Sequence, residues 1–319
     1  MKLWSHARRL WPRFTLAPAA PFWAWAAFWA ARGQLRWDHV AMAVLVTVLA
    51  YSSAKTKRLF VGLLPVGLVG LFYDAMRFVK NVGLSPSTVH VCDLRAAELR
   101  WFGVGADSSR VTLQDWFQAH ASIGLDIVCA IPYGTFIIVV LAYAIFLFVT
   151  DFPALKRFTW GFLALNVVGF LTYHLYPAAP PWYYHQHGCA VDLGSAASAG
   201  PNLLRVDALM GLHYFGGFYG RSSDIFGAVP SLHVAYPLLM VFEGWRRHRA
   251  LGRTLLVLFY AWMCVAAVYL DHHWVIDLVV GSGYVLAVVF ATRKIDRWLR
   301  APASDVRVSP PTEMEHEHG

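Results

Sequence analysis

The chain has 319 residues, of which 58% are hydrophobic and only 14% are charged, with a formal net charge of +8. A soluble domain carries about a quarter charged residues, so this composition excludes an ordinary soluble protein and indicates a membrane protein with several spans. Much of the excess Lys and Arg lies in short loops. It is therefore a signal of membrane topology and argues against a role in nucleic-acid binding.

Seven apolar runs predict an all-α fold, a polytopic membrane helix bundle of six or more transmembrane helices. The runs are Val40–Ser53, Leu59–Phe78, Asp126–Thr150, Phe158–Tyr176, Pro230–Gly244, Arg253–Tyr269 and Trp274–Thr292. Most of them approach the ~20 residues that a helix needs to cross a bilayer. The first and fifth runs are short, which is compatible with a tilted, buried or partly re-entrant helix.

The chain divides into three parts by composition. Residues 1–37 contain the Trp-rich apolar stretch Ala17–Ala30, which either lies in the membrane interface or spans the bilayer as well. Residues 38–300 contain the apolar runs and form the predicted transmembrane catalytic domain. Residues 301–319 are Pro-rich and polar, and we predict a disordered tail there.

Basic loops predict the orientation of the bundle, because Lys and Arg accumulate in cytoplasmic loops. Such clusters occur at residues 55–58, 155–157, 246–253 and 293–300. The long segments 80–125, 177–229 and 270–273 then share the opposite face. Cys92 and Cys189 both fall in these outer segments, where a disulfide is one possibility if that face is oxidising, and unpaired thiols are the other.

The stretch YLDHHWVID (Tyr269–Asp277) places acidic and imidazole side chains at the mouth of an apolar run, where a charge is costly. His273 and Asp277 are four residues apart, so in a helix they lie on the same face. A carboxylate in that position accepts a hydrogen bond from one imidazole nitrogen and leaves the other free to act as a base or a nucleophile. The same spacing also occurs in purely structural pairs.

A second stretch, FGAVPSLHVAYPLLM (Phe226–Met240), leads through Gly and Pro into an apolar helix. Pro230 suits a first helical turn, whose free N–H groups form a natural anion site together with Ser231. His233 lies beside that site. Two outward helix starts, each with a histidine, match phosphoryl transfer through a phosphohistidine, in which one imidazole attacks phosphorus and the other moves protons.

The sequence PSLHVA and, further along the chain, HHWVID resemble the two C-terminal signatures of the phosphatidic acid phosphatase type 2 superfamily. By this resemblance His273 is the nucleophile and Asp277 its orienting partner. His233 is then the general acid and base, and Ser231 contacts the phosphate. YPAAPPWY (Tyr176–Tyr183), GAVPSLH and YLDHHWVIDLVVG are more narrowly similar to the inositol phosphorylceramide synthase branch and its bacterial relatives.

The chain departs from the superfamily in its cationic groups. A typical phosphatase has Ser-Arg shortly before the nucleophilic histidine, where this chain has Ala266 and Ala267. Positive charge must still reach the phosphate, because electrostatics and positioning carry most of the catalysis of phosphoryl transfer. Arg77 and Arg221 are the candidate phosphate ligands, with Lys80 a weaker one. The alternative for each is interfacial anchoring by snorkelling.

The resemblance implies a membrane phosphotransferase of sphingolipid metabolism that needs no metal or other cofactor. The expected reaction moves phosphoinositol from phosphatidylinositol, through phospho-His273, to the hydroxyl of a lipid such as ceramide. The partners are then a phospholipid donor, a lipid-alcohol acceptor and the bilayer itself. We expect a multi-pass protein of the bacterial cytoplasmic (inner) membrane, with its active site on the periplasmic face.

Two alternatives remain at this point. A lipid phosphate phosphatase would use the same residues with water as the acceptor, although the missing Ser-Arg and the APPW stretch favour the transferase. A transporter or channel would use an intramembrane Asp and His as a proton relay. The ionisable residues cluster at the outer ends of the apolar runs and not at their centres, which disfavours the transporter.

Overall fold

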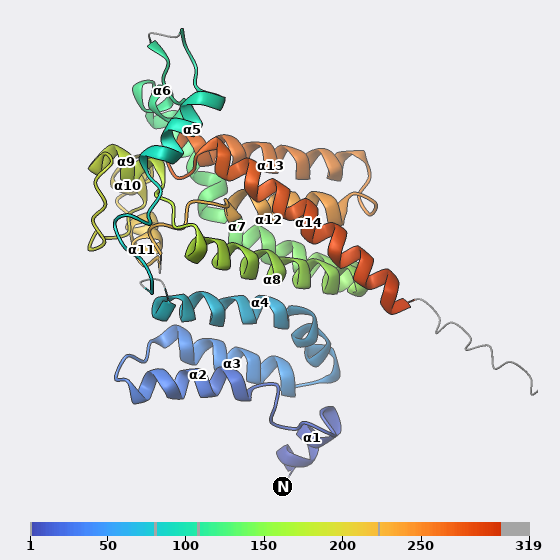
Figure 1. Ribbon diagram of the computed structural model, residues 1–319. Helices are drawn as coiled ribbons and strands as arrows, with labels where there is room; N and C mark the ends of the chain where they lie inside the picture. The colour runs from blue at the N-terminus through green and yellow to red at the C-terminus, as the bar shows by residue number, and fades with distance from the viewer. Residues whose placement is uncertain (1, 80–81, 107–108, 223, 301–319) are drawn as a thin grey trace, which may run out of the picture.

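A computed structural model describes residues 2–79, 82–106, 109–222 and 224–300 (Figure 1). Within these ranges the regular secondary structure is helical, with isolated β-bridges between loops. The tail predicted at 301–319 and Lys80 lie outside the described residues. All seven apolar runs coincide with helices, so the prediction of an all-α membrane bundle is confirmed.

These seven helices are α3 (Trp37–Tyr51), α4 (Ala54–Val79), α7 (Ile123–Thr150), α8 (Phe152–Leu175), α12 (Leu232–Gly244), α13 (Ala250–Tyr269) and α14 (Val275–Arg300). In the described part of the chain, five helices are long and apolar enough to cross a membrane, namely α4, α7, α8, α13 and α14. The two shorter ones, α3 and α12, correspond to the first and fifth runs, whose shortness the sequence already indicated.

The N-terminal part forms α1 (Lys2–Leu10) and α2 (Ala20–Ala31), and α2 covers most of the Trp-rich stretch. In Figure 1, α2, α3 and α4 lie side by side as a layer on one side of the bundle, and α3 packs on both α2 and α4. The buried carboxylate of Asp74 in α4 holds this layer together. It accepts hydrogen bonds from the indole N–H groups of Trp25 at 3.0 Å and Trp29 at 2.7 Å, and pairs with Arg36 at 2.9 Å.

The shorter helices α5 (Cys92–Phe102), α6 (Leu113–Ala119), α9 (Pro181–His187), α10 (Gly200–Met210) and α11 (Tyr214–Tyr219) gather at one end of the bundle (Figure 1). They come from the segments that were predicted to share one face. A disulfide joins Cys92 to Cys189, with 5.5 Å between the two Cα atoms, and links α5 to the loop after α9. The pairing that the sequence left open is therefore present.

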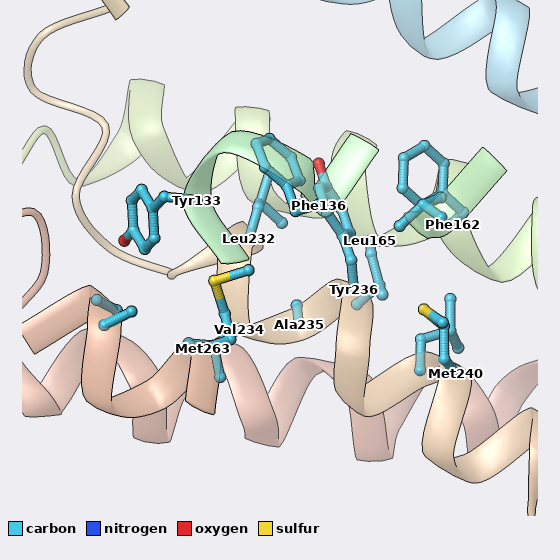
Figure 2. Close-up of a cluster of buried hydrophobic side chains, with 14 of the residues drawn as sticks. Tyr133, Phe136, Phe162, Leu165, Leu232, Val234, Ala235, Tyr236, Met240 and Met263 are labelled. Atoms are coloured by element: carbon cyan, nitrogen blue, oxygen red, sulfur yellow. The ribbon is translucent and has the colours of Figure 1, made fainter. Parts of the chain in front are cut away.

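Helix α12 lies inside the bundle and packs against α7, α8, α13 and α14. Figure 2 shows its residue Tyr236 beside Phe136 of α7 and Phe162 of α8, and the Tyr236 hydroxyl donates to Oδ1 of Asn166 at 2.7 Å. Because neighbouring helices surround α12, it does not need the length of a lipid-exposed span. Gly281 permits the closest approach, since a Cβ atom there would lie 2.6 Å from the carbonyl oxygen of Ser231.

Candidate active site

His273 and Asp277 are in contact, as their spacing predicts. Nδ1 of His273 lies 3.2 Å from Oδ2 of Asp277 and 3.0 Å from the carbonyl oxygen of Ala228. Helix α14 begins only at Val275, so this contact forms across the helix N-terminus and not along a complete helical turn as expected. Oδ2 of Asp277 also accepts the backbone N–H of Trp274 at 2.9 Å. One carboxylate thus caps the helix and orients the imidazole.

The surroundings of His273 define its protonation. Two acceptors face Nδ1, so Nδ1 carries the proton and Nε2 keeps its lone pair. Burial, which disfavours the charged form, lowers the pKa of His273 to about 4. The imidazole is therefore neutral near pH 7, and the lone pair on its Nε2 can accept a hydrogen bond or act as a nucleophile.

His233 lies in the first turn of α12, with its Nδ1 3.2 Å from Nε2 of His273. Because that Nε2 carries no proton, Nδ1 of His233 must be the donor and its Nε2 an acceptor. The hydroxyl of Tyr219 lies 3.3 Å from this Nε2 and can supply the matching proton. The ring of Tyr133 stacks on His233 with 4.6 Å between the centroids and holds its orientation. An imidazole N–H thus lies beside the Nε2 lone pair of His273, and His233 could act as a general acid once its Nε2 is protonated as well.

Ser231 is the N-cap residue of α12, and Pro230 lies just before it, outside the first turn in which the sequence predicted it. The Ser231 side chain is fully buried, and among the described residues its Oγ has no hydrogen-bond partner. Its backbone N–H donates to the carbonyl oxygen of Asp277 at 3.0 Å, which ties the starts of α12 and α14 together. An unpaired hydroxyl next to the free N–H groups of a helix start fits an oxygen-rich anion.

A cavity of about 710 Å³ borders His233 and His273, whereas the buried side chains of Ser231 and Asp277 lie behind its lining. Its polar lining residues include His233, His272 and His273, together with Ser222 and Asp224. His272 is held in place because its Nε2 lies 2.7 Å from the carbonyl oxygen of Ala199. Among the described residues that line the cavity there is no Lys or Arg.

The two arginines predicted as phosphate ligands lie together, outside that lining. Nε of Arg77 is 3.1 Å from Oδ1 of Asp74, and its Nη2 is 3.4 Å from the carbonyl oxygen of Arg221. Arg77 is therefore engaged with the carboxylate that anchors the N-terminal layer, and Arg221 is exposed. Their contact with phosphate stays a prediction.

The backbone around His273 is held by two side chains that the sequence did not indicate. Glu98 of α5 is completely buried and accepts the backbone N–H groups of Val275 at 2.8 Å and Ile276 at 3.2 Å. Nε2 of Gln114 in α6 donates both to Glu98 at 3.1 Å and to the carbonyl oxygen of His273 at 3.0 Å. Helices α5 and α6 thereby fix the segment that carries His273.

A second clamp holds the turn just before the two neighbouring histidines. Nδ1 of His185 lies 2.6 Å from Oδ2 of Asp271, and its Nε2 lies 2.9 Å from Oδ1 of Asp115. Burial alone would lower the pKa of His185, but its hydrogen bonds and the charges of the two carboxylates outweigh this effect and raise the pKa to about 9. Asp271 has a φ of 67°, a left-handed conformation that is uncommon outside glycine, so this turn depends on such support.

Membrane helices that bring a buried His–Asp pair against a second histidine, at the polar end of an apolar cavity, define a membrane enzyme that transfers phosphoryl groups. The model of the PAP2 superfamily matches residues 103–291, which contain all three of these side chains. No solved structure matches the chain.

The curated relatives narrow the class. The chain is 33% identical over 254 residues to the phosphoinositol dihydroceramide synthase of Bacteroides thetaiotaomicron, covering 79% of this chain and 82% of that protein. It is 35% identical to the inositol phosphorylceramide synthase of Candida albicans, over 53% of this chain and 36% of that one. For the inositol phosphorylceramide synthase catalytic subunit of Saccharomyces cerevisiae the identity is 28%, over 71% of this chain and 55% of the yeast protein.

The chain therefore belongs to the PAP2 superfamily and, within it, to the branch of the inositol phosphorylceramide synthases. It is a multi-pass membrane phosphotransferase, and this assignment is favoured over the phosphatase alternative.

Proposed function

We propose that this chain transfers phosphoinositol from phosphatidylinositol to the hydroxyl of ceramide or a closely related lipid alcohol. The observation that carries the proposal is the assigned proton pattern of the histidine pair, with a lone pair on Nε2 of His273 and a proton on Nδ1 of His233, 3.2 Å apart. The names of the relatives supply the headgroup and the acceptor.

In the first step, Nε2 of His273 attacks phosphorus and the bond from phosphorus to the diacylglycerol oxygen breaks. For this step His233 enters as the imidazolium, with a second proton taken up from solvent at Nε2 when the anionic phosphate binds. Its Nδ1 proton then goes to the diacylglycerol oxygen, so diacylglycerol leaves uncharged and His233 is left as a neutral imidazole. The His273 ring gains positive charge when the P–N bond forms. Asp277 stabilises this charge through its contact with Nδ1 of His273.

In the second step, Nδ1 of His233 accepts the proton of the ceramide hydroxyl while that oxygen attacks phosphorus. The P–N bond breaks and Nε2 of His273 regains its lone pair, so both histidines return to their starting states. In this proposal the phosphoryl oxygens bind to Ser231 Oγ and to the N–H groups at the start of α12, and the unpartnered state of that hydroxyl among the described residues supports the assignment. The guanidinium groups of Arg77 and Arg221 provide positive charge near the same end of the bundle.

The location follows from the arrangement of the loops. The site lies at the end of the bundle that carries α5, α6, α9, α10 and α11. The basic segments 55–58 and 155–157 lie in the first turns of α4 and α8, and 246–253 joins α12 to α13, so all three lie at the other ends of these helices. By the positive-inside rule this arrangement supports our proposal that the site lies on the periplasmic face of the bacterial inner membrane.

The proposal is tested with purified protein in mixed micelles of phosphatidylinositol and ceramide. Wild type should form inositol phosphorylceramide and diacylglycerol in equal amounts, whereas His273→Ala should form neither. Release of inositol phosphate without a ceramide product would show that water is the acceptor. The absence of any His273-dependent turnover across a panel of phospholipid donors would reject phosphotransfer at this site.

A further inference from the structure

The cavity that borders the histidines extends away from them along α4 as far as α2 and α3. Here its lining is entirely apolar, and we name this part the apolar arm. It is lined by Met42, Leu45, Leu49, Leu63, Gly67 and Gly70 among others. On α3 the lining residues recur at helical spacing, so one face of that helix forms a wall.

The lining changes character along the cavity. At the end near α12, histidine, serine, aspartate and tyrosine side chains face the space, whereas on α3 and the N-terminal half of α4 the lining side chains are hydrocarbon. A space that is polar at one end and apolar at the other fits an amphiphile, with its reacting group at His273 and its chain in the arm. We propose that the apolar arm holds one hydrocarbon chain of the reacting lipid and limits the length of that chain.

This proposal rests on the proposed function, because the position of the hydrocarbon chain is set by the lipid group that reacts at His273. The occupant is the reacting lipid because the arm is continuous with the part of the cavity that borders His233 and His273. A lipid chain enters from the bilayer, where it is already out of water, so the hydrophobic effect does not select it. Selection comes from fit, since packing contacts are lost when the chain is too short and clashes arise when it is too long.

Two glycines determine the width of the arm. Gly67 and Gly70 lie one turn apart on α4 and both line the cavity. A Cβ atom at Gly67 would lie 3.2 Å from the Phe22 ring, which is tight, whereas a Cβ atom at Gly70 would meet only the Met42 methyl group, at 3.8 Å. Position 70 therefore has room for a side chain, and a larger one there would occupy the arm.

Apolar residues of α7 and α8 that line the cavity lie within the region that the superfamily model matches, whereas the wall of the arm formed by α2, α3 and α4 lies outside it, because these helices precede residue 103. The Asp74 cluster fixes these helices to one another through Trp29 and Arg36. The N-terminal layer thus adds a chain-binding wall to the catalytic bundle.

The test is Gly70→Leu, which fills the arm and, because leucine favours helix more than glycine does, does not weaken α4. Gly283→Leu is the matched control, because Gly283 also lies within a long apolar helix, is exposed and has nothing within 4 Å of an added Cβ atom. One series varies the acceptor chain with a fixed donor, and a second varies the donor chains with a fixed acceptor.

Gly70→Leu should lower kcat/KM for long-chain substrates about tenfold in one of the two series and leave short-chain substrates nearly unchanged. The affected series identifies which lipid places its chain in the arm. An equal loss for long and short chains, or no loss in either series, would overturn the proposal. Gly283→Leu should behave as wild type in both series.

A second measurement does not depend on turnover. Phosphatidylinositol and ceramide, each with a photoactivatable diazirine in the middle of its chain, are irradiated with wild-type protein and the labelled peptides are mapped by mass spectrometry. Label on α3 and the facing part of α4, reduced in Gly70→Leu, supports the arm. Label confined to outward-facing positions such as Phe290 of α14 rejects it. If wild type shows no phosphoinositol transfer, the proposed function is wrong. The labelling still shows whether a lipid hydrocarbon chain lies in the apolar arm.

Discussion

Nε2 of His273 and Nδ1 of His233 lie 3.2 Å apart and form a direct hydrogen bond between the two imidazoles. A phosphoryl group that enters the site must replace this hydrogen bond, because both nitrogens are needed by the substrate. In the proposed reaction one forms the bond to phosphorus and the other protonates the leaving oxygen. Substrate binding would therefore convert a contact between two side chains into two contacts with one substrate.

Asp277→Asn should separate the charge of the carboxylate from its packing. Oδ2 of Asp277 makes both contacts, so an amide oxygen in its place still accepts from the N–H of Trp274 and from Nδ1 of His273, whereas the negative charge that stabilises the phosphorylated ring is lost. We expect kcat for transfer to fall by about 10²- to 10⁴-fold, as when the aspartate of a catalytic triad is replaced by asparagine, with a much smaller change in KM. Initial rates over a range of donor concentrations measure both.

The matched control is Asp126→Asn, a change of the same kind at another fully buried aspartate near the same end of the bundle, whose carboxylate pairs with Arg205. In Asp126→Asn the thermal stability should fall, whereas kcat per folded molecule should stay close to the wild-type value. If Asp277→Asn lowers thermal stability and activity in proportion, and Asp126→Asn does the same, then Asp277 does not orient the nucleophile.

The sequence predicted the parts of the site that lie close together along the chain. The contact of His273 with Asp277 follows from their spacing, and the place of His233 follows from the Pro and Ser that begin its helix. The seven apolar runs predicted the helices that carry them, because continuous hydrophobicity over such lengths has few other solutions.

The supports of the site could not be predicted in this way. Glu98 contacts residues 177 and 178 positions away, and His185 joins two carboxylates that lie 70 and 86 positions from it. No local pattern marks either side chain, since a Glu in a short amphipathic helix and a His in an aromatic loop normally face solvent. Only the packing of the outer helices over the bundle gives them partners.

Glu98→Gln should impair the segment that carries the nucleophile without touching substrate. One of its oxygens accepts the Val275 N–H and the other accepts the Ile276 N–H, so an amide leaves one of these donors unpaired or places N–H against N–H. The unfolding free energy should fall by about 1–3 kcal/mol, the cost of an unpaired buried group. In the fraction that remains folded, kcat should fall while KM stays nearly constant.

A temperature series with Glu98→Gln and Glu98→Asp checks this assignment. The aspartate keeps both oxygens and the charge on a shorter side chain, so it should recover part of kcat at temperatures where both variants are folded. Equal activities of the two variants, measured per folded molecule, would show that Glu98 serves stability alone.

His185 should make part of the stability dependent on pH. Its pKa in the folded protein, about 9, lies above the ordinary value near 6.5, so folding favours the protonated form. The contribution of protonated His185 to the free energy of unfolding is therefore complete below about pH 6.5 and is lost as the pH rises through about 9. The charged groups around it are Asp115 and Asp271, which bind it, and Arg95, which pairs with Asp115.

Thermal unfolding of wild type and His185→Asn in detergent, between pH 6 and pH 9.5, measures this contribution. The difference in Tm between the two proteins should be largest at the acid end and approach zero above about pH 9. A constant difference across this range would mean that the His185 clamp acts without its charge. The turn at Asp271 would then be held by the backbone bond from Trp182 to its carbonyl oxygen, at 2.9 Å.

Reduction of the Cys92–Cys189 disulfide should loosen the outer layer, because the bridge closes a loop between cysteines 97 positions apart. In the chain-entropy model, a disulfide that closes a loop of that length restricts the unfolded chain and stabilises the folded protein by about 4–5 kcal/mol. We expect a lower Tm in the presence of reductant and an equal loss in Cys92→Ser without it. The reductant should leave Cys92→Ser unchanged, because its three remaining thiols, Cys129, Cys189 and Cys264, have no disulfide partner in the described fold. A further drop in that variant would contradict the assignment of the reductant effect to this bridge.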